Sequence, residues 1–209
     1  MVGLHRDLAI VDEFWRLAHA TAQVEGFLDP REGYLLYRAA AEGPGIGAIV
    51  EIGSYCGRST AFLAAGAKAA QRERVFAVDH FQGSTEHQAG QPFASAVLAQ
   101  EGTTLGRFRA NLHRLDLIDH VEPIVAMSAE AAGSWRGPIR LLFIDGDHAY
   151  ESVRADFFHW TPFLVAGGLV ALHDVGHTPS VTRFFEEVQV NRDFSLVAAA
   201  VSLRFFQRM

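Results

Sequence analysis

Apolar and polar positions alternate along the chain in two patterns, one typical of helices and one of buried strands. Near the start, five apolar residues recur at helical spacing: Leu4, Leu8, Val11, Trp15 and Ala18. They predict an amphipathic helix from about His5 to Val24 that packs across the sheet or forms a lid. A second helix is expected to begin in Asp29-Pro30-Arg31-Glu32, where Asp can cap, Pro suits the first helical position and Glu can reach back to the cap. It should run to about Ala41, because Gly43-Pro44-Gly45 ends it.

From residue 48 onward, short apolar runs alternate with helical segments. The runs predict strands at Ala48–Ile52, Val75–Val78, Val121–Met127, Leu141–Ile144 and Gly168–Leu172. Helical spacing predicts helices at Ser59–Gln71, Leu105–Leu115, Tyr150–Trp160 and Thr178–Val188. The apolar tail from Phe194 to Phe206 predicts two antiparallel strands. This order indicates one α/β unit over residues 46–209, preceded by helices in residues 1–45 that lie on the substrate side.

The segment from His80 to Gly106 is polar and irregular, with a weak helical signal near Phe93–Leu98. A connection of this length inside one domain is usually functional or mobile. We therefore expect it to cover the substrate.

The composition supports a single domain and excludes several classes of partner. The chain has 209 residues, 49% of them hydrophobic, which is enough to bury a core without disulfides. Its formal net charge is -6 and its Lys and Arg residues are dispersed, so neither nucleic acid nor a membrane surface is an expected partner. The single cysteine, Cys56, excludes an intrachain disulfide framework, and no stretch resembles a signal peptide or a membrane span. We expect a cytoplasmic protein.

Two neighbouring strands are expected to end on polar side chains. The run Leu141–Ile144 stops at Asp145-Gly146-Asp147-His148, and the run Gly168–Leu172 stops at His173-Asp174. The carboxyl ends of parallel strands meet at one edge of a sheet, where open α/β folds bind their ligands. The sequence therefore predicts a site with clustered carboxylates and imidazoles at this edge.

The first strand leads into a glycine-containing turn, Glu51-Ile52-Gly53-Ser54-Tyr55-Cys56-Gly57. Its acid-x-Gly-x-x-x-Gly spacing opens a wider loop than Gly-x-Gly-x-x-Gly, which suits an amino-acid moiety more than a pyrophosphate. Asp79 follows the turn by about 20 residues, where a carboxylate can accept both hydroxyls of a ribose.

Together these features resemble the class I S-adenosylmethionine-dependent methyltransferases, from Ile49 to the C-terminus. The resemblance implies a Rossmann-like, seven-stranded, mostly parallel sheet with helices on both faces and an antiparallel C-terminal strand. It implies S-adenosylmethionine-binding residues, which are Glu51, Gly53, Ser54, Tyr55, Gly57, Ser59, Asp79, His80, Phe81, Ser128 and Asp145. By similarity, Glu51 and Gly53 border the methionine part of the cofactor. Asp79 holds the ribose, and Ser128 lies near the adenine.

The acidic strand ends resemble the small O-methyltransferases related to catechol and caffeoyl-coenzyme A enzymes, including bacterial relatives that modify natural products and sugars. The resemblance implies a divalent cation bound by Asp145, His173 and Asp174. It places His148 where catechol-type enzymes carry a general-base lysine. It thus predicts metal-assisted O-methylation of a hydroxyl on a small-molecule acceptor, such as a phenol, a sugar or a natural-product intermediate.

His173 stands where those relatives have an oxygen ligand, which leaves alternatives open. An imidazole suits Mn, Fe or Zn better than Mg, and His173 could instead be a base without any metal. His148 could cap the helix that follows it or bind a backbone carbonyl. Asp147 could support a ligand or cap the same helix.

Three rival functions remain on the sequence alone. One is a metal-independent N- or O-methyltransferase with His148 or His173 as its base. Another is a nicotinamide-dependent oxidoreductase, against which the missing Gly-x-Gly-x-x-Gly counts. The third is a non-catalytic cofactor-binding protein, which would not need the acidic and histidine sets. The apolar helices and tail are also compatible with a homodimer.

Overall fold

The computed structural model describes residues 2–209, without the side chains of residues 2–10 and 13. Its α-helices are α1 (Val2–Thr21), α2 (Pro30–Glu42), α3 (Arg58–Ala69), α4 (Ala96–Glu101), α5 (Leu105–Arg114), α6 (Ser128–Ser134), α7 (Tyr150–Trp160) and α8 (Pro179–Gln189). Its strands are β1 (Ala48–Ile52), β2 (Val75–Asp79), β3 (Val121–Val125), β4 (Ile139–Ile144), β5 (Leu164–Leu172), β6 (Phe194–Ala200) and β7 (Leu203–Arg208).

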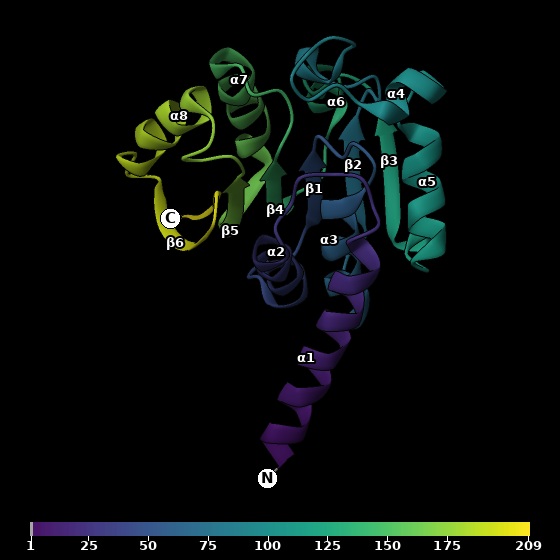
Figure 1. Ribbon diagram of the computed structural model, residues 1–209. Coiled ribbons are helices and arrows are strands. Elements are labelled where there is room, and N and C mark those ends of the chain that lie inside the picture. The colour runs from purple at the N-terminus through teal and green to yellow at the C-terminus, as the bar shows by residue number, and fades with distance from the viewer. Residues whose placement is uncertain (1) are drawn as a thin grey trace.

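The strands form one seven-stranded sheet in the order β3-β2-β1-β4-β5-β7-β6 (Figure 1). The first five of these strands are parallel, and β7 runs antiparallel to both β5 and β6. The predicted fold class is confirmed, including the reversed strand near the C-terminus. All five parallel strands deliver their carboxyl ends to the same edge.

Strand β4 shows why this sheet is covered on both faces. Leu141 and Phe143 belong to a core cluster shared with α1, α2, α3 and α5. Leu142 and Ile144 belong to a second cluster shared with α6, α7 and α8. Successive strand side chains point to opposite faces, so a strand that is apolar at every position is buried on both sides.

Helix α2 is part of the main core. It begins with the predicted capping box, in which the Asp29 side chain accepts from the N–H of Arg31 and Glu32 accepts from the N–H of Asp29. Gly33 and Gly66 let α2 and α3 approach closely, since a Cβ on Gly66 would lie 2.2 Å from the carbonyl oxygen of Tyr37. The division of the chain at residue 45 stays a prediction.

Helix α1 differs from its predicted packing. It contacts α2 and α3 through its last turns, where Phe14 and Ala18 are buried. Val11 and Trp15 are exposed, so the predicted apolar stripe is wrong at these two positions, while Leu4 and Leu8 lie outside the described side chains. The helix extends away from the edge that carries the strand carboxyl ends (Figure 1), so it does not cover a site there.

Several other elements depart from the expected boundaries, and β5 and β3 show the reasons. Strand β5 begins at Leu164, because it pairs with Ile139 of β4 before Gly167, at a φ of +74°, interrupts the ladder. Strand β3 ends at Val125, and Ser128 begins the short helix α6, which the sequence pattern did not predict. A seven-residue helix presents too few periodic positions for its spacing to be recognised.

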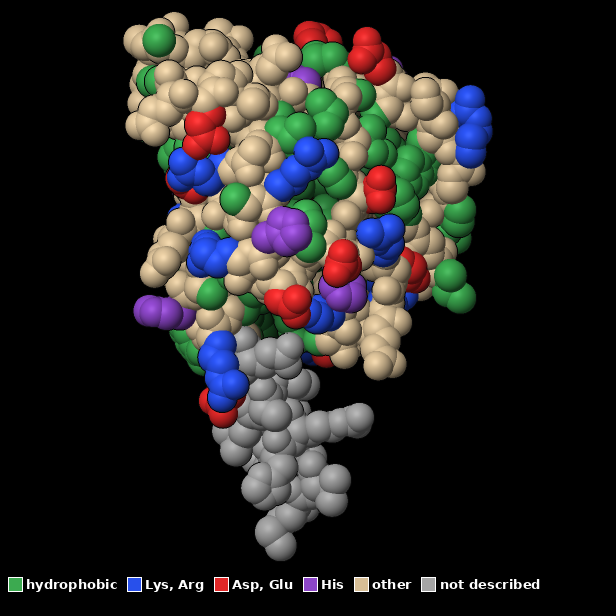
Figure 2. All heavy atoms as spheres, turned by 90° about the vertical axis from the view of Figure 1, so that its right-hand side faces the viewer, with side chains coloured by type: hydrophobic (Ala, Val, Ile, Leu, Met, Phe, Trp, Pro, Cys, Tyr) green, Lys and Arg blue, Asp and Glu red, His purple; other side chains and the backbone are tan. Residues whose placement is uncertain are grey.

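The surface agrees with the dispersed charges of the sequence. On the face shown in Figure 2, Lys and Arg side chains are interspersed with Asp, Glu and His and form no single basic area. In the described part of the chain, no helix is both long and apolar enough to cross a membrane.

Candidate active site

Two adjoining cavities lie at the carboxyl edge of the sheet. One, of about 410 Å³, extends from the β1 turn over the ends of β2 and β3 to helix α7. The other, of about 370 Å³, extends from the same turn over the ends of β4 and β5. They share wall residues, which are Gly53, Tyr55, His87, Asp145 and Gly146. A ligand lying over the turn would therefore enter both.

Glu51 organises the turn from behind. Its side chain is fully buried and accepts hydrogen bonds from Ser54 Oγ at 2.7 Å and Ser59 Oγ at 2.6 Å, and from the hydroxyl of Thr60. Burial raises the pKa of Glu51 to about 7, against the effect of these hydroxyls. Glu51 lines neither cavity, so its contribution to the site is the shape of the turn.

Asp79 ties the end of β2 to the same turn. Its Oδ2 accepts from the N–H groups of Ser54 and Tyr55, each at 2.8 Å, and its Oδ1 accepts from the N–H of Phe81 at 2.6 Å. Gly53 has a φ of +84°, and a Cβ there would lie 2.2 Å from the carbonyl oxygen of Asp145. The turn therefore packs directly against the acidic end of β4, which only glycine permits.

The larger cavity contains two polar side chains that the sequence did not single out, Thr104 and Asp156, beside the predicted Ser128. Thr104 is buried in its wall, and its Oγ1 has no hydrogen-bond partner in the described part of the chain. Asp156 of α7 lines the same cavity, and burial raises its pKa to about 6. Ser128 accepts from Trp160 Nε1 at 2.9 Å, and its hydroxyl opposes the rise in the pKa of Asp156. A buried, unsatisfied hydroxyl in a cavity wall is expected to meet a bound polar ligand.

His173 lies almost fully buried between three carboxylates. Its Nδ1 is 3.0 Å from Asp145 Oδ1 and 3.2 Å from Asp174 Oδ2, and its Nε2 is 3.1 Å from Glu32 Oε2. Burial alone would lower the pKa of His173, but the surrounding carboxylates raise it above its ordinary value. One ring nitrogen thus faces the paired aspartates, and the other faces α2.

His148 repeats this arrangement at the cavity wall. Its Nε2 is 2.9 Å from Asp174 Oδ2 and its Nδ1 is 2.7 Å from Glu86 Oε1. The hydrogen bond to Asp174 raises the pKa of His148 to about 9, although burial opposes the change. The His148 side chain is 26% exposed and that of His173 only 5%. Of these two imidazoles, His148 is therefore the one that a molecule in the cavity can reach.

The geometry of these groups is compatible with a cation. Asp145, His148 and Asp174 each offer one ligand atom, and the three atoms lie within 4.8 Å of one another. Nδ1 of His173 faces the same two carboxylates. Asp147 points elsewhere and accepts from Ser152 Oγ at 2.5 Å, near the start of α7.

Most of the predicted site residues meet at the two cavities, and three do not. Those in the cavity walls are Gly53, Ser54, Tyr55, Ser59, Asp79, His80, Ser128, Asp145, His148, His173 and Asp174. Glu51, Gly57 and Phe81 lie behind the turn or beside it and line neither cavity. The roles given to all of these residues stay predictions.

The sequence interpretation missed four further side chains: Glu32, Glu86, Thr104 and Asp156. Glu32 was recognised only as part of a capping box, and Glu86 and Thr104 lie in the predicted covering segment or at its end. Asp156 occupies an inward position of an amphipathic helix, where an acidic residue is unusual and could have been noticed.

The chain is similar to known methyltransferases both in sequence and in fold. Residues 50–175 match a protein-family model described as a methyltransferase domain. The fold is similar to that of the O-methyltransferase NovP, with a TM-score of 0.68 and 18% identity over 86% of this chain and 80% of NovP.

Two other solved structures show the same fold. An O-methyltransferase from Bacillus cereus in complex with SAH matches with a TM-score of 0.64 and 18% identity over 96% of this chain and 91% of that one. The calicheamicin methyltransferase CalS11 matches with a TM-score of 0.64 and 16% identity over 94% of this chain and 91% of that one.

Proposed function

The chain belongs to the methyltransferase-domain family as an S-adenosylmethionine-dependent enzyme, and we propose that it methylates a hydroxyl oxygen of a small molecule with the help of a divalent cation. One observation carries the proposal. The turn at Gly53 packs on Asp145, so the predicted cofactor turn and the carboxylate–imidazole cluster are walls of adjoining cavities. A methyl donor over the turn would meet an acceptor held by the cluster.

The larger cavity fits the nucleoside part of the cofactor. Its wall offers the unsatisfied Thr104 hydroxyl, the Asp79 carboxylate at the end of β2, and the Asp156 carboxylate as acceptors or donors for ribose and adenine. Apolar walls between them come from Ile52, Val78 and Ala126. When bound, S-adenosylmethionine would supply a methyl group on a sulfonium; the acceptor oxygen would attack the methyl carbon in line, and the sulfur would leave as the thioether S-adenosylhomocysteine.

The donor set at the other cavity fits a cation. Asp145 and Asp174 provide carboxylate oxygens, and His173 provides Nδ1 if its proton is held on Nε2 by Glu32. A mixed imidazole and carboxylate set suits Mn²⁺, Fe²⁺ or Zn²⁺ better than Mg²⁺. When bound, such a cation lowers the pKa of a hydroxyl and fixes its direction.

In its neutral form, which its raised pKa of about 9 favours only at alkaline pH, His148 is the proposed acceptor of the hydroxyl proton. It lies in the cavity wall, and the carboxylates of Asp174 and Glu86 flank its two nitrogens. These carboxylates stabilise the imidazolium that forms when His148 takes a proton. They also hold the ring in one orientation.

The acceptor side of the smaller cavity carries aromatic surface. Phe27 and Phe93 are 68% and 53% exposed, and their rings contact each other at 5.8 Å between centroids. His87 stacks between Phe27 and Tyr55, with centroids at 6.3 and 5.2 Å. This surface supports an acceptor with a flat apolar face, such as a phenol or an aromatic natural product.

The proposal predicts cation-dependent methylation. The purified protein is incubated with S-adenosylmethionine, with Mn²⁺, Zn²⁺ or Mg²⁺, and with a panel of phenols, sugars and aliphatic alcohols. The masses of the products are then measured by mass spectrometry. We expect one added methyl on a hydroxyl acceptor. Activity should fall at least about 100-fold after chelation or in Asp145→Ala, because both remove the group that positions the hydroxyl.

Asp12→Ala, at an exposed position on α1 that lines neither cavity, is the matched acidic control and should retain full activity. Full activity after exhaustive chelation and in Asp145→Ala would show that the cation part is wrong. Methylation of amines alone would show that the acceptor class is wrong.

A second function is favoured by one observation. Both ring nitrogens of His173 face carboxylates, so a His173 imidazolium could partly neutralise this cluster without a cation and leave a neutral His148 as the base. The enzyme would then be a metal-independent methyltransferase that uses His148 as its base. Unchanged activity after chelation, together with loss of activity in His148→Gln, distinguishes this function from the first.

A further inference from the structure

Glu32 occupies an unusual position for a helix-capping residue. It lies in the first turn of α2, it is 1% exposed, and four donors converge on its two carboxylate oxygens. Oε2 accepts from the N–H of Asp29 at 3.0 Å and from His173 Nε2 at 3.1 Å. Oε1 accepts from the N–H and the hydroxyl of Ser202 at 2.8 and 2.7 Å.

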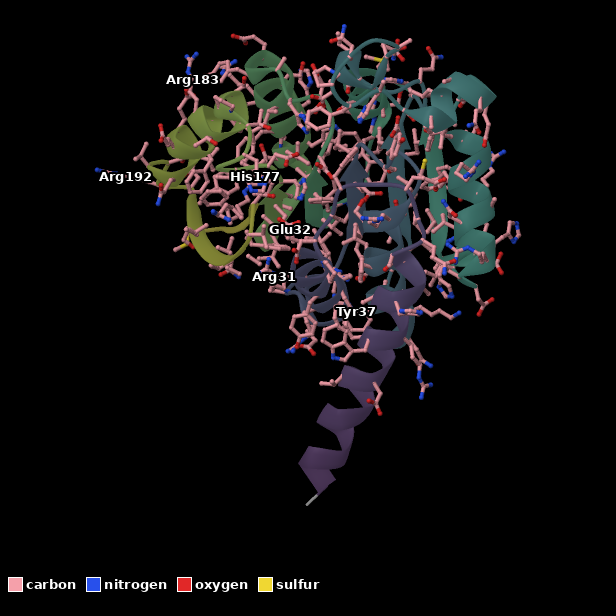
Figure 3. All side chains as sticks on the ribbon, in the orientation of Figure 1. Arg31, Glu32, Tyr37, His177, Arg183 and Arg192 are labelled. Carbon is pink, nitrogen blue, oxygen red and sulfur yellow. The ribbon has the colours of Figure 1, made fainter. Side chains whose placement is uncertain are left out.

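A capping role explains only one of these contacts. The bond from the Asp29 N–H completes the capping box, and a Glu in that role usually lies at the surface. The remaining donors are His173, which directly follows β5, and Ser202, in the turn between β6 and β7, and both are far from α2 in the chain. In Figure 3, Glu32 lies on α2 below His177, on the side of the helix that faces the ends of β4 and β5. The side chain therefore connects α2 to the carboxyl edge.

The orientation of His173 follows from this contact. A neutral imidazole has one N–H and one lone pair, and a carboxylate on one nitrogen holds the proton there. If a cation displaces the Nδ1 proton while Nε2–H stays directed at Glu32, the lone pair of Nδ1 points to the position between Asp145 and Asp174. Histidines that bind metals in proteins usually donate their other N–H to a carboxylate or carbonyl in this manner.

We propose that Glu32 is a positioning residue of the cation site, acting through His173. The inference rests on the proposed function, because it requires that Asp145, His173 and Asp174 bind a divalent cation. It assigns to the N-terminal helix α2 a part of the site that the strand ends alone do not supply.

His148 provides a comparison within the same site. Its outer nitrogen faces Glu86 at 2.7 Å, but the two side chains are 26% and 29% exposed. Those of His173 and Glu32 are 5% and 2% exposed. The buried pair has no water to replace the carboxylate, so its loss has the larger effect on ring orientation.

The test measures Mn²⁺ binding to the full chain by titration calorimetry and by the electron paramagnetic resonance of free Mn²⁺. Glu32→Gln should weaken Mn²⁺ binding about 10- to 100-fold, which is the usual effect of removing such a partner. Asp29→Ala is the matched control, because it removes the Asp29 side-chain cap of α2 without touching His173. It should lower the melting temperature and leave Mn²⁺ affinity unchanged.

A double-mutant comparison separates positioning from a purely structural role. His173→Asn replaces the imidazole with an amide, whose oxygen can bind a cation without a carboxylate partner. In this background, Glu32→Gln should cause little further loss of Mn²⁺ affinity. An equal loss in both backgrounds would overturn the inference, because Glu32 would then act independently of His173.

If Glu32→Gln does not fold, Glu32→Asp retains the charge and withdraws the carboxylate by one methylene. It should weaken Mn²⁺ binding in the same direction. Wild-type affinity in folded Glu32 variants would overturn the inference and leave the proposed function intact. Absence of Mn²⁺ and Zn²⁺ binding to the wild-type chain would overturn both the inference and the cation part of the proposed function.

Discussion

His148 and His173 each lie between carboxylates that come from different parts of the chain. His173 lies between Glu32 and the aspartates of β4 and β5, and His148 lies between Asp174 and Glu86. The sequence predicted the inner carboxylates, because they follow directly after apolar runs. It did not predict the carboxylates of Glu32 and Glu86, which face the other nitrogen of each ring. No local pattern shows which atom of an imidazole will face a distant helix or loop.

Asp156 illustrates the cost of an acidic group in a cavity wall. The residue is 8% exposed and burial raises its pKa from 3.8 to about 6. The folded protein therefore binds this proton more tightly than the unfolded chain. The free energy of unfolding therefore falls as the pH rises from about 4 to 6. Above that range, the buried Asp156 carboxylate lowers it by the full amount of about 3 kcal/mol.

Asp156→Asn should thus be more stable than the wild type at pH 7, by up to about 3 kcal/mol. The difference should shrink towards zero below about pH 4, where Asp156 is protonated in both states. Urea denaturation at several pH values measures this. A stability difference that does not change between pH 3.5 and 7 would contradict the assigned environment of Asp156.

At the scale of elements, the boundaries that depend on local signals were predicted well. The capping box at Asp29 and Glu32 starts α2, Pro179 starts α8, and the helix Tyr150–Trp160 has its predicted bounds. These signals work because a cap satisfies backbone groups within a few residues. The start of β5 was not predicted, since a strand boundary depends on the neighbouring strand to which it hydrogen bonds.

The contact of α2 with α3 gives a prediction at this scale. A Cβ on Gly66 would lie 2.2 Å from the carbonyl oxygen of Tyr37, and backbone atoms cannot rotate away as a side chain can. Gly66→Ala should therefore destabilise the protein by about 1–3 kcal/mol or more, although Ala favours a helix.

Gly133→Ala is the matched control for this substitution. Gly133 also lies in a helix, α6, and a Cβ there would have no neighbour within 4 Å. This variant should be unchanged or more stable by about 0.5–1 kcal/mol. Equal effects of the two substitutions on the free energy of unfolding would show that α2 and α3 are not in close contact.

At the scale of the whole molecule, the strand order brings the site together. Residues from β1, β2, β4 and β5 meet at one edge because these strands are parallel neighbours in the sheet. The two cavities lie over this edge, between the helical layers that cover the sheet. A ligand that fills them contacts elements of both core clusters.

A ligand of this kind should stabilise the entire fold. At 100 times its dissociation constant, S-adenosylhomocysteine should add about 2.7 kcal/mol to the free energy of unfolding and raise the melting temperature. NAD should not, because the β1 turn does not have the spacing that binds a pyrophosphate. Thermal denaturation with each ligand measures the difference, and stabilisation by NAD alone would instead support the rival oxidoreductase.

The sequence by itself determined the fold class, the sites of most helices and strands, and the acidic and histidine residues at the strand ends. These follow from periodicity and caps, which act over a few residues. Only the tertiary structure decided the partners of those residues. The side chain of Glu51 lies behind the turn and lines neither cavity. The side chain of Glu32 contacts His173, which is 141 positions away in the chain. Such contacts depend on how α2 packs against the sheet, and this packing is not encoded in any local pattern.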